Sequence, residues 1–161
     1  MQPRNDWRVY ILRHADTVRK PPRELNPHGI EQAHRMGLAL AQLEYRHMIL
    51  YSPYARTSQT AEIIAEHVRA TSVASFNILR EYEAGEPFDE MVERGRLALK
   101  VACTLFRFNP IIISHREPIR AMVARIFDKN PKHLRAIAVP KTGGFVLDFG
   151  GSSQYINAEM Y

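Results

Sequence analysis

Four side chains suited to phosphate chemistry stand at or near the ends of short apolar runs. Arg13 and His14 directly follow the run Val9–Leu12, and His115 follows another such run late in the chain. Arg56 lies one helical turn beyond a third run. A guanidinium group binds phosphate oxygens as a bidentate fork, and a neutral imidazole can attack phosphorus. These residue types therefore indicate phosphoryl transfer through a histidine.

The sequence does not indicate a metal or a nucleotide cofactor. A metal site requires several deprotonated ligands that converge, and we find no cysteine–histidine or carboxylate cluster at ligand spacing. A Walker loop and a G-x-G-x-x-G motif after an apolar run are also absent. We therefore expect an anion site that works without metal or cofactor. Structural roles are expected for the other histidines, which show no ligand spacing with one another: His28, His34, His47, His67 and His133.

Apolar runs alternate with segments of helical periodicity, and this alternation predicts the elements that position the site. Strands are expected over Val9–Leu12, Met48–Tyr51, Val73–Leu79 and Ile111–Ile113, with one or two more between Ala136 and Asp148. Helices are expected from Asn26-Pro27 to about Tyr45, from Ser52-Pro53 through Val68, over Phe88–Phe106, and from Pro118 through Ile126.

This order of elements favours a three-layer α/β/α sandwich with a mostly parallel central sheet. Ligand sites in such sheets lie beyond the carboxyl ends of the strands. His14 and His115 would both reach that edge. No repeat, linker or composition shift marks a boundary, so we expect a single domain over residues 1–161.

Length and composition match a globular protein, with 161 residues of which 45% are hydrophobic and 24% are charged. No apolar stretch approaches the ~18 residues of a membrane helix, and the N-terminal run is too short for a secretory signal. The single cysteine, Cys103, cannot form an internal disulfide and is expected in the core. We therefore expect a cytoplasmic protein with no membrane partner.

The net charge of +5 favours acidic partners such as nucleic acids, phosphates or phosphoproteins. Aromatic residues are not interleaved with the arginines, as a stacking platform for nucleic acid would require. We therefore expect a phosphorylated substrate and no nucleic-acid partner, and the oligomeric state stays open. Arg19, Lys20 and Arg23 form a basic loop that is either solvated or steers acidic substrates.

Five segments in order resemble the histidine phosphatase superfamily, which has the phosphoglycerate-mutase-like fold. They are Leu12-Arg13-His14, Leu25–Ala33, Ser52–Ala61, Leu79-Arg80-Glu81 with Gly85, and Ser114-His115. Each segment alone is a weak signal. Five in order over nearly the whole chain are specific.

The resemblance implies a role for each of five residues. His14 would be the nucleophile, and Glu81 would be the proton donor. The phosphate pocket would be formed by Arg13, Arg56 and His115, and His115 would also take part in catalysis. In-line attack by His14 would form a phosphohistidine, which water then hydrolyses.

Several departures from the family pattern bear on this site. Ala15 stands where glycine is usual, and Lys20 stands where many members place an asparagine that contacts phosphate. Glu86-Pro87-Phe88 replaces the usual Trp-Glu-Gly. Arg116-Glu117 replaces small residues after the second histidine, which would narrow the pocket or add a positive charge to it.

Two segments near the expected site allow more than one interpretation. Glu83 and Glu86 lie close to Glu81 in sequence and are alternative proton donors. Lys141-Thr142-Gly143-Gly144 precedes a predicted closing strand. This segment can approach the pocket, or its glycines can simply form a β-turn.

The length of the chain bears on the substrate. About thirty residues separate Glu83 from Ser114, nearly all in one predicted helix, which leaves no room for the inserted cap of the family's mutases. The chain is most similar to the short phosphohistidine phosphatase type, whose open pocket suits a phosphorylated protein side chain. Short members that act on sugar phosphates or nucleotides look alike at this level, and a non-catalytic phosphate-binding scaffold is a third alternative.

Overall fold

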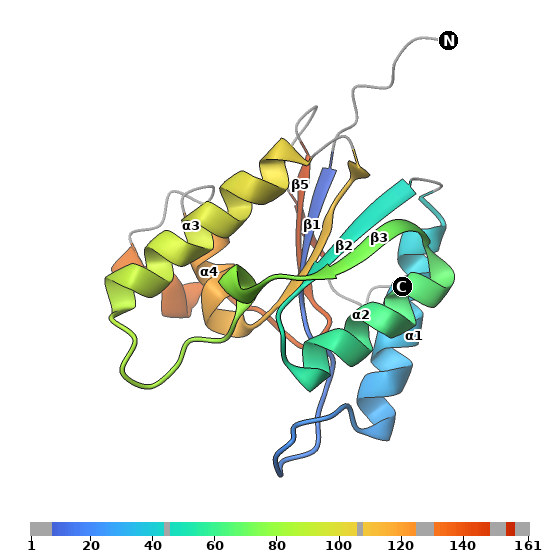
Figure 1. The fold of residues 1–161 in the computed structure, drawn as a ribbon, viewed down its shortest axis with the longest axis horizontal. Coiled ribbons are helices and arrows are strands. Elements are labelled where there is room, and N and C mark those ends of the chain that lie inside the picture. The colour runs from blue at the N-terminus through green and yellow to red at the C-terminus, as the bar shows by residue number, and fades with distance from the viewer. Residues whose placement is uncertain (1–7, 44–45, 106–107, 125–130, 149–153, 157–161) are drawn as a thin grey trace, which may run out of the picture.

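A six-stranded sheet forms the centre of the molecule, in the order β3-β2-β4-β1-β5-β6 (Figure 1). The structure is a computed structural model that describes residues 8–43, 46–105, 108–124, 131–148 and 154–156. The strands are β1 (Arg8–Arg13), β2 (Arg46–Tyr51), β3 (Arg69–Ser75), β4 (Ile111–Ser114), β5 (Gly144–Asp148) and β6 (Gln154–Ile156). Strands β3, β2, β4 and β1 pair in parallel, whereas β5 and β6 are antiparallel. The mostly parallel sheet is confirmed.

Two pairs of helices cover the two faces of this sheet. Helices α1 (Pro27–Ala41) and α2 (Ala55–His67) lie on one face, and α3 (Phe88–Thr104) and α4 (Arg116–Ala124) lie on the other (Figure 1). Short 3-10 helices occupy Asn77–Leu79 (η1) and Pro131–Ala136 (η3). The layers confirm the predicted α/β/α sandwich. Among the helices that the structure describes, none has the length and apolar character needed to cross a bilayer.

Strand β1 contributes to both halves of the core. Successive side chains of a strand point to opposite faces of the sheet. Val9 and Ile11 therefore pack toward α3 and α4, whereas Tyr10 and Leu12 pack toward α1 and α2. All four are at most 2% exposed. Burial on both faces explains why the sequence shows a continuous apolar run here rather than an alternating one.

Parallel pairing brings the carboxyl ends of β1, β2 and β4 to one edge of the sheet. Arg13 is paired with Ser114, and Tyr51 is paired with Ile113. Backbone hydrogen bonds extend this ladder one residue further, because the N–H of His14 donates to the carbonyl of Ser114 at 3.1 Å. The segments that follow these three strands therefore start side by side, as predicted.

The helix that follows β1 begins as the sequence predicts. Asn26 caps α1 by accepting a hydrogen bond from the N–H of Gly29 at 2.7 Å, and Pro27 occupies the first turn. The helix ends at Ala41, earlier than predicted, and Tyr45 lies outside the described residues. The side chain of Asn26 thus fixes the entry into α1 at the edge where the expected site lies.

The second helix begins later than the predicted start at Ser52-Pro53. Helix α2 begins at Ala55 after Tyr54, and the hydroxyl of Ser52 contacts the ring of His115 instead of a helix N–H. Strand β3 also begins and ends earlier than the predicted Val73–Leu79. It is an edge strand whose side chains are mostly exposed, so its apolar pattern is weak.

Other boundaries differ by small amounts. Helix α4 begins two residues before Pro118, and the predicted ends at Phe106 and Ile126 lie outside the described residues. The segment between Ala136 and Asp148 holds one described strand, β5. Cys103 is partly exposed rather than a core residue.

Candidate active site

The turns after β1 and β4 bring the two predicted histidines together. The ring centroids of His14 and His115 lie 5.2 Å apart. Tyr54, at the start of α2, packs its ring edge-on against His115, and the guanidinium carbon of Arg56 lies 4.6 Å from the centre of the Tyr54 ring. Nη2 of Arg56 donates to Oε2 of Glu81 at 2.5 Å. Four of the five predicted residues therefore lie in one cluster, in which Tyr54 bridges His115 and Arg56.

Arg13 flanks this cluster at the end of β1. Its Nη1 donates to the carbonyl of Val139 at 2.9 Å, and its backbone N–H donates to the carbonyl of Gly143. Burial lowers the pKa of Arg13 to about 10, and the charge of Arg116 acts in the same direction. The group therefore stays cationic at neutral pH. Its Nε is buried and has no hydrogen-bond partner among the residues that the structure describes.

The tautomer of His14 follows from its backbone contact. Nδ1 lies 2.8 Å from the carbonyl oxygen of Ala15. Because a carbonyl oxygen only accepts, Nδ1 carries the proton in the neutral ring and Nε2 keeps its lone pair. His14 is 4% exposed. The ring is thus fixed in the form that a nucleophile at Nε2 requires.

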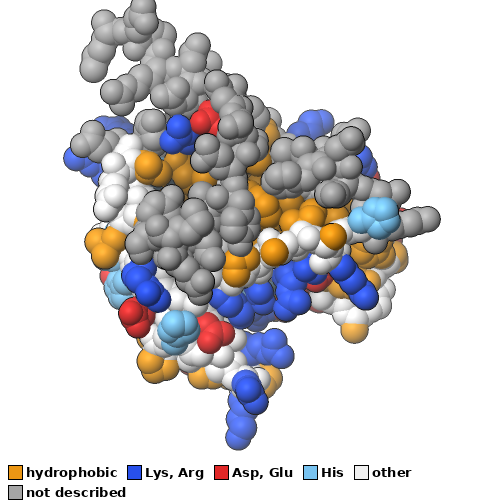
Figure 2. Space-filling model, turned by 180° about the vertical axis from the view of Figure 1, so that it is seen from behind, with side chains coloured by type: hydrophobic (Ala, Val, Ile, Leu, Met, Phe, Trp, Pro, Cys, Tyr) orange, Lys and Arg blue, Asp and Glu red, His pale blue; other side chains and the backbone are white. Residues whose placement is uncertain are grey.

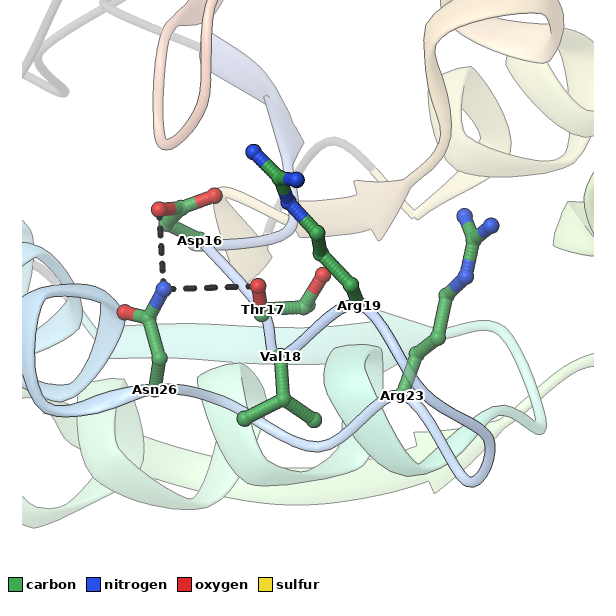
Figure 3. A pocket seen from close by; sticks show the side chains of 6 residues that line it. All are labelled: Asp16, Thr17, Val18, Arg19, Arg23 and Asn26. Atoms are coloured by element: carbon green, nitrogen blue, oxygen red, sulfur yellow. Dashed lines mark hydrogen bonds between the residues drawn. The ribbon is translucent and has the colours of Figure 1, made fainter.

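Polar side chains from α1 and α2 hold the backbone beside His14. The N–H of Ala15 donates to Oγ1 of Thr60 at 3.1 Å, and the N–H of Asp16 donates to Oε1 of Gln32 at 2.9 Å. Asn26 donates to Oδ2 of Asp16 and to the carbonyl of Thr17 (Figure 3). The helices therefore fix the position of the ring through its own backbone.

A chain of hydroxyl groups sets the protonation of His115. Oγ1 of Thr57 lies 2.7 Å from the carbonyls of Ser52 and Tyr54, so its single proton is donated to a carbonyl. Ser52 then donates to Thr57 at 2.8 Å, and Nε2–H of His115 donates to Ser52 at 2.6 Å. Nδ1 of His115 is buried and lacks a partner within the described part of the chain.

The cluster opposes protonation of both rings. Burial lowers the pKa of His14 to about 2, and the charges of Lys141, His115 and Arg56 act in the same direction. Burial also lowers the pKa of His115 to about 3, with Arg56 and Arg13 as further causes. Burial is therefore the main reason that both rings are neutral at pH 7, and the neighbouring cations add to it.

Lys141 joins the site through the turn before β5. The N–H of Thr142 faces the carbonyl of His14 at 3.5 Å, and Nζ of Lys141 lies 3.9 Å from Oδ1 of Asp16. A Cβ on Gly144 would lie 1.7 Å from the carbonyl oxygen of Ile11, so glycine allows the turn to approach β1 this closely. Both interpretations of this segment therefore hold, because the β-turn itself brings a cation beside His14.

If the predicted phosphate chemistry takes place, Lys141 should give its pH profile an alkaline limb. Burial and the charge of Arg13 lower its pKa to about 8, so the ammonium is present below this pH and is lost as the pH rises through it. We expect kcat/KM for a phosphate ester to fall in that range, because an anion then loses a positive partner. Lys141→Arg should remove the fall, and an unchanged limb in this variant would contradict the assignment.

The three candidate glutamates have different partners. Glu86 accepts from Arg80 and Arg94, which fixes the loop. Glu83 accepts a hydrogen bond from the hydroxyl of Tyr54. Glu81 contacts Arg56, which packs over the Tyr54 ring beside His115, and its side chain is 43% exposed. Glu81 is thus the carboxylate that directly contacts a predicted phosphate ligand.

The departures from the family pattern have clear positions. Ala15 is fully buried against Leu25 and Ala33, so its methyl group is accommodated. Lys20 is exposed on the loop after β1. After burial, the charge of Arg116 is the next cause that lowers the pKa of Arg13. Arg116 therefore adds positive charge near the pocket, which is one of the two effects expected from the sequence.

The sequence analysis missed the supporting residues of this site. Ser52 is predicted only as the start of a helix, although it donates to Thr57 and accepts from His115. Gln32 and Thr60 lie in segments that carry the family resemblance, but spacing alone gave them no role. A buried polar residue at an otherwise apolar helix position is the signal that could have found Gln32 and Thr60.

A comparison with protein families decides the membership of the chain. The model of the histidine phosphatase superfamily, branch 1, matches residues 9–87 and 75–159. The chain belongs to this superfamily. The mouse mitochondrial serine/threonine-protein phosphatase PGAM5 is 34% identical over 84 residues, which are 49% of this chain. The chain spans only about 29% of that relative's length.

Solved structures share the fold at low sequence identity. YhfR of Bacillus stearothermophilus has a TM-score of 0.78 at 19% identity, covering 92% of this chain and 94% of its own. SixA of Agrobacterium tumefaciens, named as a phosphohistidine phosphatase, has a TM-score of 0.70 at 21% identity, covering 93% and 95%. Phosphoserine phosphatase of Entamoeba histolytica has a TM-score of 0.73 at 16% identity, with the same coverage. These likenesses establish the phosphoglycerate-mutase-like fold of this chain.

Proposed function

We propose that the chain is a phosphatase that works through a phosphohistidine on His14 and needs no metal. The observation that carries this proposal is an unprotonated Nε2 on His14 near the cations of Lys141 and Arg56, with the charge of Arg13 acting on the neighbouring His115. Two buried polar atoms beside it, Arg13 Nε and His115 Nδ1, have no partner among the described residues. Buried polar atoms are normally satisfied, and phosphate oxygens would accept from Nε–H of Arg13 and, once His115 is protonated, from its Nδ1–H.

In the first step, Nε2 of His14 attacks phosphorus in line with the leaving group. The new bond joins Nε2 to phosphorus, and the bond from phosphorus to the leaving oxygen or nitrogen breaks. Arg13, Arg56 and a protonated His115 would stabilise the charge on the equatorial oxygens. A bound phosphate dianion raises the pKa of His115, which allows Nδ1 to become a donor.

In the second step, water attacks phosphorus and the bond to Nε2 breaks, which restores the lone pair of His14. Glu81 would give a proton to the leaving group first and then accept one from this water. Its contact with Arg56 keeps the carboxylate beside the phosphate-binding guanidinium. Arg80 and Arg94 hold its loop, and Arg94 also donates to the carbonyls of Ile78 and Arg80.

The short segment between Glu83 and Ser114, most of which is helix α3, supports a phosphorylated protein side chain as substrate, most simply phosphohistidine. The segment that would form a cap in a larger member is here α3, which packs against α4 and η1. Lys and Arg side chains gather toward the carboxyl edge of the sheet (Figure 2). Arg19 and Arg23 extend from the loop after β1 and line an open hollow (Figure 3). These charges would attract an acidic protein surface.

A small phosphomonoester, such as a sugar phosphate or a nucleotide, is the alternative substrate. The observation that favours it is Glu81 itself, because alkoxide leaving groups need a proton donor more than an imidazole does. The decisive experiment compares phosphohistidine peptides, sugar phosphates and nucleotides in the presence of EDTA. We expect the highest kcat/KM on phosphohistidine peptides. A preference for a small ester would support the alternative, and activity lost to EDTA would contradict the mechanism.

Replacing Glu81 by glutamine should affect substrates according to their leaving groups. We expect kcat/KM to fall by about 100-fold on an alkyl phosphate and much less on an aryl phosphate, whose leaving group needs little protonation. Steady-state rates on the two esters measure this difference. Equal losses would count against a proton donor at Glu81. The same pattern in Glu83→Gln would move the role to Glu83.

A further inference from the structure

Two histidines that the sequence places far apart meet on the outer side of the molecule, between α1 and α2. Nδ1 of His34 lies 2.8 Å from Nε2 of His67, and the rings meet nearly edge-on with centroids 5.2 Å apart. Glu66 offers a carboxylate oxygen beside them, and the three ligand atoms all lie within 4.8 Å of one another. Sequence spacing gives no sign of this pair, which the packing of α1 on α2 brings together.

We propose that His34, His67 and Glu66 bind one Zn²⁺ ion that links α1 to α2. Two imidazoles and one carboxylate are a recognised protein ligand set for zinc, and water completes the tetrahedron. In that geometry the two nitrogens stand about 3.3 Å apart, given Zn–N bonds of about 2.0–2.1 Å. The present separation of 2.8 Å needs only a small rotation of the rings to reach it.

The ligands are available in the required chemical form. In the present pair one neutral ring donates its N–H to the other. Moving that proton to the outer nitrogen of the same ring, through solvent, leaves lone pairs on both facing nitrogens, so neutral rings bind the ion without net loss of protons. Glu66 is exposed and forms no salt bridge with any residue in the described ranges. Its charge is free to offset that of the ion.

The site is partly preorganised by packing. His67 is the last residue of α2 and lies against Gly37 of α1, where a Cβ would stand 2.6 Å from Cδ2 of the ring. Glycine at this position lets the two helices approach closely enough for the rings to meet. Figure 1 shows the two helices side by side, and they pack directly together.

The site is separate from the phosphate-binding cluster. Arg56 stands in the first turn of α2 and His67 stands at its last residue, which are about 16 Å apart along the helix axis. An ion here would therefore act on the packing of α1 and α2 and would supply no ligand to the reacting phosphate. The proposed zinc site is therefore an addition to the metal-independent phosphatase chemistry and leaves that chemistry unchanged.

Calorimetric titration of the full chain with zinc chloride, after EDTA treatment and removal of the chelator, tests this site. We expect one equivalent of zinc to bind. His34→Gln and Glu66→Gln should each weaken zinc affinity by at least about 10-fold, because the loss of a residue that only supports a metal ligand already costs about that much. Zinc should also raise the Tm of the parent chain but not that of His34→Gln. His133→Gln, an exposed histidine in η3, serves as the matched control.

The other outcomes each overturn the proposal. Absence of zinc binding by the parent chain would show that His34 and His67 form a hydrogen-bonded pair only. Binding that survives in both His34→Gln and Glu66→Gln but is lost in His14→Ala would place the ion at the phosphate cluster instead. Because Glu66 is exposed, its glutamine variant tests the site even if a change at His67 disturbs the packing on Gly37.

Discussion

Replacing His14 by alanine should abolish turnover of every phosphorylated substrate while the chain stays folded. In the proposed mechanism Nε2 of His14 is the only atom that bonds to phosphorus before water does, so no other side chain can take over the first step. We expect kcat to fall by at least about 1,000-fold, equivalent to about 4 kcal/mol of barrier. Steady-state hydrolysis of an aryl phosphate measures this loss over an ample range.

The fold of this variant needs a separate check, because His14 is buried at the end of β1. Its ring donates to the carbonyl of Ala15, which alanine cannot do, so a modest loss of stability is expected. Circular dichroism and the Tm should still show a folded chain at the assay temperature. His14→Gln provides a second test that keeps a polar side chain there. Substantial turnover by either folded variant would rule the mechanism out.

Replacing Arg56 by alanine should cause the second largest loss. Arg56 is 6% exposed, and its guanidinium lies between the Tyr54 ring and Glu81. Removal of one preorganised donor to a developing oxyanion typically costs about 100- to 1,000-fold in rate. We expect a loss of this size in kcat/KM, measured on the same aryl phosphate.

The lysine variant and a distant arginine sharpen this prediction. Arg56→Lys should recover little activity, because an ammonium group is a point charge and cannot form a bidentate fork. Arg96→Ala on α3 removes the same charge from an exposed position and should leave the rate unchanged. If Arg56→Ala retained nearly full kcat/KM, Arg56 would be a structural partner of Glu81 and not a phosphate ligand.

Apolar continuity and strand order made much of the fold predictable. Strands β1, β2 and β4 are buried on both faces, so their runs of apolar residues stand out in the sequence. In parallel sheets, ligands bind beyond the carboxyl ends of the strands, and this rule placed His14 and His115 at that edge of the sheet. The edge strand β3 is mostly exposed, so its apolar pattern is weak, and the predicted strand lay too far along the chain for that reason.

The parts that could not be predicted depend on contacts between distant segments. Ser52 and His115 are 63 residues apart, and nothing in their local sequence indicates a shared hydrogen bond. Lys141 approaches Asp16 through a turn before β5, and only the antiparallel pairing of β5 with β1 brings the two segments together. The pairing of His34 with His67 likewise depends on the packing of two helices.

Trapping the phosphorylated enzyme tests the central claim most directly. The chain would be mixed with ³²P-labelled substrate and quenched during turnover in alkali or in acid, and the labelled peptide would then be identified. We expect label on His14 that survives alkali and is lost in acid, as a phosphoramidate behaves, with none on the His14→Ala variant. Label that survives acid, or label on a residue other than His14, would contradict the account.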